Sequence, residues 1–340
     1  MKLRYILAAL LFAAPLSAQE AKNVQYLKGM TSIQLQRTMN FMRASLGVHC
    51  DYCHVVSDEK GWDWASDAKP EKEAGRKMIA MVIDMNTKYF EGHTDVTCNT
   101  CHRGSTRPVG QVPLPQAQPP FPTPKTERPP LPTRDEIVAK YAAAIGKVDE
   151  NALASMTMKA TREAPDGKTT PIALEQTGSS VRVNAGEQIV QVVTADSGWV
   201  KDDKPAREMN KGMVENQHQL ADAFHVILPK EIPANARVVR KDKIGDRDAY
   251  IVQNATPSGR QRLWFDAQNG LLLRRVTTMA TPIGDVPMQT DYSDYRDVAG
   301  MKLPFVVRVD SVDPWIGSTR KYSEIHVGAK IDPNDFVMPK

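Results

Sequence analysis

Two segments in the first third of the chain carry apolar residues at the spacing of an amphipathic helix. The first begins with Thr31 and Gln34 at capping-box spacing, and Gly47 is expected to end it. Its apolar face consists of Leu35, Met39, Met42 and Leu46. The second is predicted over about residues 71–90, a rod of about 30 Å. Its apolar side consists of Ala74, Met78, Met81 (or Val82), Met85 and Tyr89. Each helix precedes a pair of cysteines.

The last two thirds of the chain follow a different pattern. Thr133 and Glu136 first predict a short helix that ends at about Ile145. Short runs of β type then occupy residues 236–244, 248–254, 260–266 and 271–279. Asn269-Gly270 is a strong hairpin-turn signal, and a helical interruption is predicted near residues 213–226. The predicted fold class is therefore α + β and multidomain: a helical domain, then a mostly antiparallel, curved β-sheet with few helices.

A proline-rich segment separates the two patterns. Prolines recur at positions 108, 113, 115, 119, 120, 122, 124, 129, 130 and 132. Because proline has a fixed φ angle and no backbone donor, residues 108–132 are predicted to form an extended spacer. A proline-rich motif that binds a partner is the alternative. The spacer divides the chain into domains of residues 19–107 and 133–340, and cleavage within it should separate them.

The N-terminus has the three parts of a secretory signal. Lys2 and Arg4 precede an apolar run over residues 6–14, and small residues follow at Ser17 and Ala18. Residues 1–18 are therefore predicted to be a signal peptide that is cleaved after Ala18, which places the mature protein in the periplasm. An uncleaved anchor is the alternative, although the apolar run is short for a bilayer.

The amino-acid composition argues against some classes of protein. A length of 340 residues suggests two or three domains, and 41% hydrophobic with 25% charged residues are ordinary globular values. A mean hydropathy of −0.42 argues against a polytopic membrane protein. The formal net charge of +4 is small for this length, so electrostatics give no case for nucleic-acid binding.

The cysteines carry the clearest chemical signal. All four fall in two Cys-x-x-Cys-His motifs, residues 50–54 (CDYCH) and 98–102 (CNTCH). This sequence attaches c-type haem, because two thiols at this spacing reach the two vinyl groups of one porphyrin. The residues that would form thioethers are Cys50, Cys53, Cys98 and Cys101. His54 and His102 would each supply an imidazole nitrogen to an iron. We therefore predict two covalently bound haem c groups, attached after export.

Two other interpretations of the cysteines compete. A tetrathiolate zinc site would use both Cys-x-x-Cys pairs, which suit tetrahedral zinc. Disulfides are the second, since four cysteines of an exported chain allow three connectivities. Neither explains why a histidine directly follows both pairs, so haem attachment is favoured.

The sequence around the motifs resembles the photosynthetic reaction-centre cytochrome c subunit family. The similar stretches are residues 23–30 (NVQYLKGM), 47–54 (GVHCDYCH), 75–81 (GRKMIAM) and 96–104 (VTCNTCHRG). The resemblance covers roughly residues 23–110. The family subunit carries four haems in two similar pairs, whereas this chain has cysteines for one pair. The resemblance implies an exported dihaem electron carrier with a redox protein as donor and another as acceptor, in a membrane-associated redox complex.

The same resemblance implies a methionine as the second axial ligand of each iron. In the family, a helix before each attachment motif supplies it, and by position Met39 matches the first and Met78 the second. Met42 and Met81, one turn along, are the alternatives, and ordinary core methionines are the other interpretation. His93 lies close to where the family places a ligand for a haem of the other pair. Because that haem has no counterpart here, a surface histidine is favoured.

Aromatic and basic residues would complete the surroundings of the haems. The aromatic candidates for shielding the porphyrins, or for an ordinary core, are Tyr52, Trp62, Trp64 and Tyr89. Arg76, Arg103 and Arg107 are candidates for pairing with haem propionates.

The second half carries no cysteine, no nucleophile–base motif and no glycine-rich phosphate loop. It resembles the periplasmic lipoprotein-carrier fold at residues 263–266 (LWFD), 269–272 (NGLL), 291–296 (DYSDYR) and 303–305 (LPF). The resemblance implies a half-open β-barrel whose concave face holds an apolar ligand or docks a partner; a structural role is equally compatible. An electron carrier, not a catalyst, is the favoured function. The alternatives are a dihaem peroxidase-like oxidoreductase and a periplasmic apolar-ligand-binding protein with accessory haems.

Overall fold

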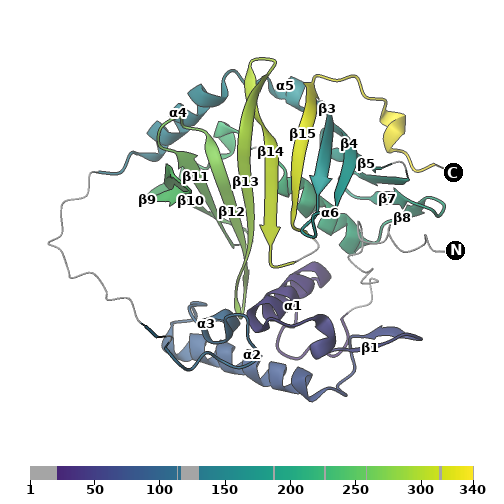
Figure 1. The fold of residues 1–340 in the computed structure, drawn as a ribbon, viewed down its shortest axis with the longest axis vertical. Coiled ribbons are helices and arrows are strands. Elements are labelled where there is room, and N and C mark those ends of the chain that lie inside the picture. The colour runs from purple at the N-terminus through teal and green to yellow at the C-terminus, as the bar shows by residue number, and fades with distance from the viewer. Residues whose placement is uncertain are drawn as a thin grey trace.

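The computed structural model describes residues 21–112, 114–115, 130–186, 188–225, 227–257, 259–313 and 316–339. Within them, a smaller part with helices precedes a large sheet (Figure 1). The predicted signal peptide, residues 1–18, lies outside the described residues, and so do residues 113 and 116–129 of the predicted spacer. None of the helices in these ranges is long and apolar enough to cross a membrane.

The first predicted helix is α1, Ser32–Leu46. Its capping box is formed as expected: Thr31 Oγ1 accepts from the Gln34 N–H at 3.3 Å, and Gln34 Oε1 accepts from the Thr31 N–H at 2.9 Å. Gly47 ends the helix with a φ of 68°, in the left-handed region that glycine tolerates. The absence of a side chain at Gly47 also allows the backbone of Gly104, just after the second motif, to pack against the end of α1.

The second predicted helix is α2, Pro70–Tyr89, but its buried side is not the predicted one. The buried residues are Arg76, Ile79, Val82 and Asn86. Met78, Met81 and Tyr89 of the predicted side are 41%, 43% and 76% exposed, so among the predicted residues the alternative Val82 was correct. Apolar residues surround the helix over residues 78–85 (MIAMVIDM), so spacing alone could not select the side that contacts the sheet.

Each Cys-x-x-Cys-His motif forms a short helical turn. The first is η2, Cys50–Tyr52, and the second is α3, Cys98–His102. A small antiparallel hairpin of β1, Val55–Ser57, and β2, Gly61–Asp63, directly follows the first motif. The N-terminal part thus consists of two longer helices, two motif turns and this hairpin.

The C-terminal part is built on one antiparallel sheet of 13 strands in the described ranges, in the order β8-β7-β6-β5-β4-β3-β15-β14-β13-β12-β11-β10-β9. Helices α4, Arg134–Ile145, and α5, Glu150–Leu153, precede it, and α6, Lys211–Ala223, with η3, Pro229–Glu231, interrupts it. The strands are β3 (Ser155–Glu163), β4 (Thr169–Thr177), β5 (Ser180–Ala185), β6 (Ile189–Val193), β7 (Gly198–Lys201), β8 (Arg207–Glu208), β9 (Arg237–Ile244), β10 (Arg247–Thr256), β11 (Gly259–Asp266), β12 (Leu272–Thr281), β13 (Gly284–Val298), β14 (Met301–Ser311) and β15 (Ser318–Val327), followed by η4 (Pro333–Phe336). The four predicted strands are confirmed as β9 to β12, and the two predicted helices as α4 and α6.

One core cluster joins α4 to strands that lie far apart in the sheet. Ile137, Tyr141 and Ile145 of α4 belong to this cluster. Its partners on the sheet include Ala160, Ile172, Leu174, Val252, Leu263, Phe265, Leu272, Tyr292, Phe305, Val307 and Tyr322, which come from β3, β4 and β10 to β15.

The turn between β12 and β13 reaches down into the helical part (Figure 1). Ile283 at its tip is fully buried. It belongs to a core cluster with Leu27, Phe41, Ile79, Val82, Cys98, Met279 and Val286. Gly284 approaches so closely that a Cβ there would lie 2.9 Å from Thr97 Cγ2 and 3.1 Å from the Phe41 ring. The sheet therefore completes the core of the helical part.

A second contact joins α1 to the segment between β14 and β15. Asn40 Nδ2 donates a hydrogen bond to Asp313 Oδ2 at 2.8 Å, and both residues are buried. Arg43 Nη2 donates to the Val312 carbonyl at 3.4 Å. The expectation that cleavage of the spacer separates the two parts is therefore revised, because a shared core and buried polar contacts hold them together.

Candidate functional site

Both Cys-x-x-Cys-His motifs place two thiols and an imidazole on one side of a single helical turn. In the first motif, the N–H groups of Cys53 and His54 donate to the Cys50 carbonyl at 3.3 and 3.0 Å. Residues at positions i, i+3 and i+4 of such a turn share a face. The five residues of α3 repeat the arrangement with Cys98, Cys101 and His102. The structure therefore brings together each set of attachment residues that the sequence predicts.

The four cysteines are free thiols in differing surroundings. Cys50 and Cys101 are exposed, Cys53 is half-buried and Cys98 is buried. Burial raises the pKa of the Cys50, Cys53 and Cys98 thiols. Within the described ranges, no three histidine, cysteine or acidic side chains gather closely enough to hold a metal ion, so the tetrathiolate zinc interpretation finds no support there.

His102 has one ring nitrogen held by the backbone. Its Nδ1 lies 2.9 Å from the Ser105 carbonyl, which can only accept, so Nδ1 carries the proton. The hydrogen bond fixes the tautomer in which Nε2 is free to bind a metal. Arg103 and Gly104, both with positive φ angles, make the turn that returns the chain to His102.

His54 has no such hydrogen bond, and its Nδ1 is buried without a partner. Its ring packs edge-on against Trp64, with 5.1 Å between centroids, and Trp64 stacks on Trp62 at 4.6 Å and 7°. Burial lowers the pKa of His54, with the charges of Lys72, Arg76 and Lys69 adding to the effect, while the backbone of Trp64 opposes it. The first imidazole is therefore packed against the Trp64 ring, and its Nδ1 has no hydrogen-bond partner among the described residues.

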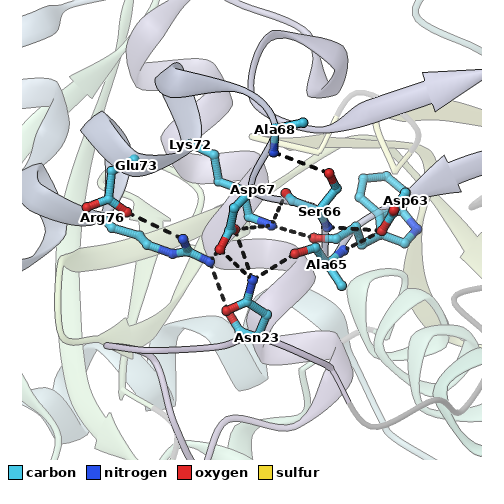
Figure 2. A network of polar contacts seen from close by, with 10 residues as sticks. Asn23, Asp63, Ala65, Ser66, Asp67, Ala68, Lys72, Glu73 and Arg76 are labelled. Atoms are coloured by element: carbon cyan, nitrogen blue, oxygen red, sulfur yellow. Dashed lines mark hydrogen bonds and ion pairs between the residues drawn. The ribbon is translucent and has the colours of Figure 1, made fainter.

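A polar network fixes the segment that carries Trp64 (Figure 2). Lys72 Nζ donates to the carbonyls of Trp64 at 2.8 Å and Ser66 at 2.7 Å. Arg76 Nη2 lies 2.8 Å from Asp67 Oδ1, and Lys72 Nζ lies 3.3 Å from the same oxygen. Asn23 Nδ2 donates to both Asp67 oxygens at 2.9 Å. The network ties residues 63–68 to the start of α2.

This network changes the interpretation of Arg76. Its guanidinium is buried and is also bonded to Glu73 at 3.4 Å and to the Asn23 carbonyl at 3.3 Å. Hydrogen bonds from Arg76 and Asn23 hold the pKa of Asp67 well below its usual range. Arg76 thus pairs with Asp67, while Arg103 and Arg107, the other predicted propionate partners, are exposed.

The two predicted methionine ligands have different environments. Met39 of α1 is partly buried and packs against the cluster that contains Ile283, as does Met42. Met78 of α2 is 41% exposed and so is its alternative, Met81, at 43%. Large apolar side chains seldom gather on the surface of a soluble protein without a function. The N-terminal part exposes eight of them: Tyr26, Tyr52, Val56, Trp62, Trp64, Met78, Met81 and Tyr89.

His49 and His93 are exposed, which agrees with the expectation of a surface histidine at position 93. Sequence reasoning missed Lys72 and Asp67, which position Trp64, and Ile283, which packs beside Cys98. The position of Lys72 in the first turn of a helix is a weak sequence signal of such a role, because a cation is unfavourable there and so needs a reason to be present. Nothing in the local pattern around Ile283 distinguishes it from an ordinary hairpin residue.

The concave face of the sheet is predicted to hold an apolar ligand or to dock a partner, and this stays a prediction. Side chains of α4 pack in the core cluster of the sheet. Tyr141 is fully buried, its ring lies 5.0 Å from that of Phe265, and its hydroxyl donates to the Ile227 carbonyl at 2.6 Å. A pocket of about 590 Å³ lies at the other end of the sheet, near β7. Trp199, Met209, Glu208, Lys211, Phe336 and Met338 are among its lining residues. Both polar and apolar residues line it.

A search of solved structures finds partial similarity to two proteins. A LolA superfamily protein from Nitrosomonas europaea is 14% identical with a TM-score of 0.38, covering 62% of this chain and 99% of that chain. A putative outer membrane lipoprotein-sorting protein domain from Vibrio parahaemolyticus is 10% identical with a TM-score of 0.38, covering 59% of this chain and 94% of that chain.

Curated relatives match the N-terminal part. Cytochrome c-554 of Chloroflexus aurantiacus is 37% identical over 90 residues, which are 24% of this chain and 20% of that protein. The photosynthetic reaction center cytochrome c subunit of Thermochromatium tepidum is 35% identical over 98 residues, which are 28% of this chain and 23% of that protein. The chain spans about a fifth to a quarter of the length of these relatives. Residues 9–119 match the family described as the photosynthetic reaction centre cytochrome C subunit, and the resemblance recognised in the haem-attachment sequences is thereby confirmed.

Proposed function

We propose that the protein is an exported dihaem electron carrier. Cys50 and Cys53 would hold one haem c and Cys98 and Cys101 the other, with His54 and His102 as axial ligands. The observation that carries the proposal is the shared geometry of the motifs: each is one helical turn with both thiols and the imidazole on one face. Bound haem supplies a one-electron couple at iron, which a protein side chain cannot.

The surrounding residues fit such a group. Nδ1 of His102 is engaged by a carbonyl, as expected for a ligating imidazole, and Nδ1 of His54 is buried without a partner beside the Trp64 backbone. Tyr52, Trp62 and Trp64 are exposed apolar side chains in or beside the first motif, and a large planar group would cover them. The donor set of two thiols and one imidazole per turn suits c-type attachment.

Met39 and Met78 remain our proposed second axial ligands. A thioether is a soft ligand that favours ferrous iron and raises the potential. With two protein ligands for each iron, transfer of an electron needs no open coordination position, which favours a carrier over a peroxidase-like catalyst. We further propose cleavage after Ala18, a periplasmic location, a spacer over residues 108–132, and redox-protein donor and acceptor partners in a membrane-associated complex. The C-terminal sheet, residues 133–340, would support the haem-binding part, residues 19–107.

The test is the number of covalent haems. The full chain, produced with a working haem-ligation system, should carry two that survive acid–acetone extraction. The double variant Cys50→Ala/Cys53→Ala should carry one, and so should Cys98→Ala/Cys101→Ala. Stoichiometric zinc without haem, or haem lost entirely on extraction, would overturn the proposal.

A further inference from the structure

We propose that Arg162 and Arg320 form a binding site for a phosphate group on the face of the sheet that packs against α4. The two arginines lie on neighbouring strands, β3 and β15, and are directly paired in the antiparallel register. The site belongs to the C-terminal part of the chain. The inference therefore goes beyond the proposed function and does not depend on bound haem.

Both arginines lie on the face of the sheet that carries the core cluster with α4. Ala160, two positions from Arg162 on β3, belongs to that cluster. Tyr322, two positions from Arg320 on β15, belongs to it as well. Side chains two positions apart on a strand share a face, so the arginines lie on this face too. Phe224, which directly follows α6, packs against the same cluster, and the centroid of its ring lies 3.4 Å from Cζ of Arg320.

Neither guanidinium has a hydrogen-bonding or ion-pair partner among the described residues. Nη1 of Arg162 and Nε of Arg320 are buried and unpaired. Arg182 also has a buried, unpaired Nε, but its Nη1 lies 3.5 Å from Glu175 Oε2 and 3.0 Å from Asp335 Oδ1. Arg162 and Arg320 differ from Arg182 because no carboxylate in the described part of the chain neutralises either of them.

Two paired arginines without a counter-ion are unfavourable in a sheet. Directly paired residues on antiparallel strands have Cβ atoms about 4.5–5.5 Å apart, and like charges at this separation are destabilising. Burial lowers the pKa of Arg162 and the charge of Arg320 adds to this effect, while Asp166 opposes it. A bound anion would remove the repulsion between the two side chains.

The acidic side chains closest to the pair in the sequence are already occupied. Glu163, next to Arg162, has an oxygen 2.8 Å from Nζ of Lys321. Asp166, in the turn after β3, has an oxygen 2.9 Å from Nζ of Lys168. Among the described residues, the positive charge of the pair is therefore left without a counter-ion.

The chemistry of the pair fits a phosphate group. Each guanidinium offers a planar set of N–H donors that matches two oxygens of a phosphate. A phosphate group carries about −1.5 to −2 charges at pH 7, which two guanidinium groups balance, whereas a carboxylate carries only one. Thr170, which is paired with Arg162 on β4 and is 9% exposed, adds a hydroxyl on the same face. Both arginines are only partly buried, so an ion from solution can reach them.

Two sources supply this chemistry, a free phosphate ion and the head group of a phosphate-bearing lipid. Val307, which is paired with Arg320 on β14 and is 1% exposed, borders the site on its apolar side. An apolar chain attached to the phosphate would find a matching surface there, whereas a free ion would use the arginines alone.

The test is isothermal titration calorimetry of the full-length protein in phosphate-free buffer at constant ionic strength. Inorganic phosphate represents the free ion, and dodecyl phosphate below its micelle concentration represents the head group. We expect saturable binding of at least one probe at one site per chain. Arg162→Gln and Arg320→Gln should each weaken binding about tenfold or more, because a hydrogen bond to a charged group contributes free energy of that order. Tighter binding of dodecyl phosphate than of inorganic phosphate would assign the site to a head group, and equal affinity would assign it to the free ion.

Two further variants separate specific binding from general attraction. Arg320→Lys keeps the charge but loses the planar set of donors, so its affinity should lie between those of the parent and Arg320→Gln. Arg308→Gln on β14 is the matched control, because Arg308 is exposed and its Nε lies 3.0 Å from Asp310 Oδ2. It should keep the parent affinity.

Thermal unfolding in phosphate-free buffer provides a second measurement. Because each glutamine variant removes one of two like charges, Arg162→Gln and Arg320→Gln should be at least as stable as the parent without ligand. Phosphate should raise the unfolding temperature of the parent more than that of either variant. The proposal would be overturned if neither probe bound the parent saturably, if both glutamine variants kept the parent affinity, or if Arg308→Gln weakened binding equally. If a glutamine variant does not fold, parent affinity in Arg320→Lys would overturn the proposal and weaker binding would support it.

Discussion

Truncation of Ile283 to alanine tests the contact between the sheet and the helical part at its centre. Ile283 is fully buried among side chains from α1, α2 and α3. The change removes three carbon groups, worth about 2.4 kcal/mol of transfer free energy, and the cavity brings the expected loss to about 2–5 kcal/mol. Because its neighbours lie across the junction, most of this loss should weaken the docking of the two parts.

The assay uses a specific protease site introduced within residues 116–129. After cleavage, the two parts of the parent protein should stay together in size-exclusion chromatography, because the shared core and the Asn40–Asp313 hydrogen bond remain. Ile283→Ala should weaken the complex by about 30-fold to 4,000-fold. Val239→Ala, on β9 and 38% exposed, is the control and should stay within about 0.5 kcal/mol of the parent. Separation of the cleaved parent, or equal behaviour of the two variants, would refute the reasoning.

Three other predictions concern single side chains. Met39→Leu should change the absorption spectrum of one haem and lower its reduction potential, and Met78→Leu should do the same to the other haem. Each change should lower the free energy of unfolding by less than about 1.5 kcal/mol. If both variants keep the parent spectrum, the assignment is wrong and Met42 and Met81 become the candidate ligands. In the reduced, haem-free chain, an alkylating reagent should modify Cys101 before Cys98, because Cys98 is buried and burial raises the pKa of its thiol; peptide mass spectrometry showing equal rates for Cys98 and Cys101 would contradict this. Asp67 has a lowered pKa in the folded protein, so it stabilises the fold above its unfolded pKa and this contribution is lost as the pH falls through the folded pKa. Urea unfolding of Asp67→Asn should therefore depend less on pH below about pH 4 than the parent, and identical pH profiles would argue against the ion pair with Arg76.

Local signals predicted much of the secondary structure. Capping boxes at Thr31 and Thr133 located the starts of α1 and α4, because a cap depends on residues three positions apart. The turn at Asn269-Gly270 separated β11 from β12 for the same local reason. The predicted haem-attachment residues are also a local signal, since each set lies within five consecutive residues.

Features that depend on distant segments could not be predicted in this way. The buried side of α2 is set by Ile283, about 200 residues away in the sequence, and apolar residues surround that part of the helix. The Asn40–Asp313 bond joins residues 273 positions apart. Lys72 binds the Trp64 and Ser66 carbonyls because residues 63–68 fold back onto α2, and no sequence motif predicts this contact. The cysteines and histidines of the candidate site could therefore be predicted from the sequence, whereas the residues that pack around them could not.

A potentiometric titration of the purified full-length protein, followed by absorbance, tests the central claim most directly. The account predicts two one-electron steps from two covalently attached, low-spin haems. A preparation without haem absorbance would contradict the claim of a cytochrome. A high-spin iron that binds external ligands would contradict the claim of a carrier and favour a peroxidase-like catalyst.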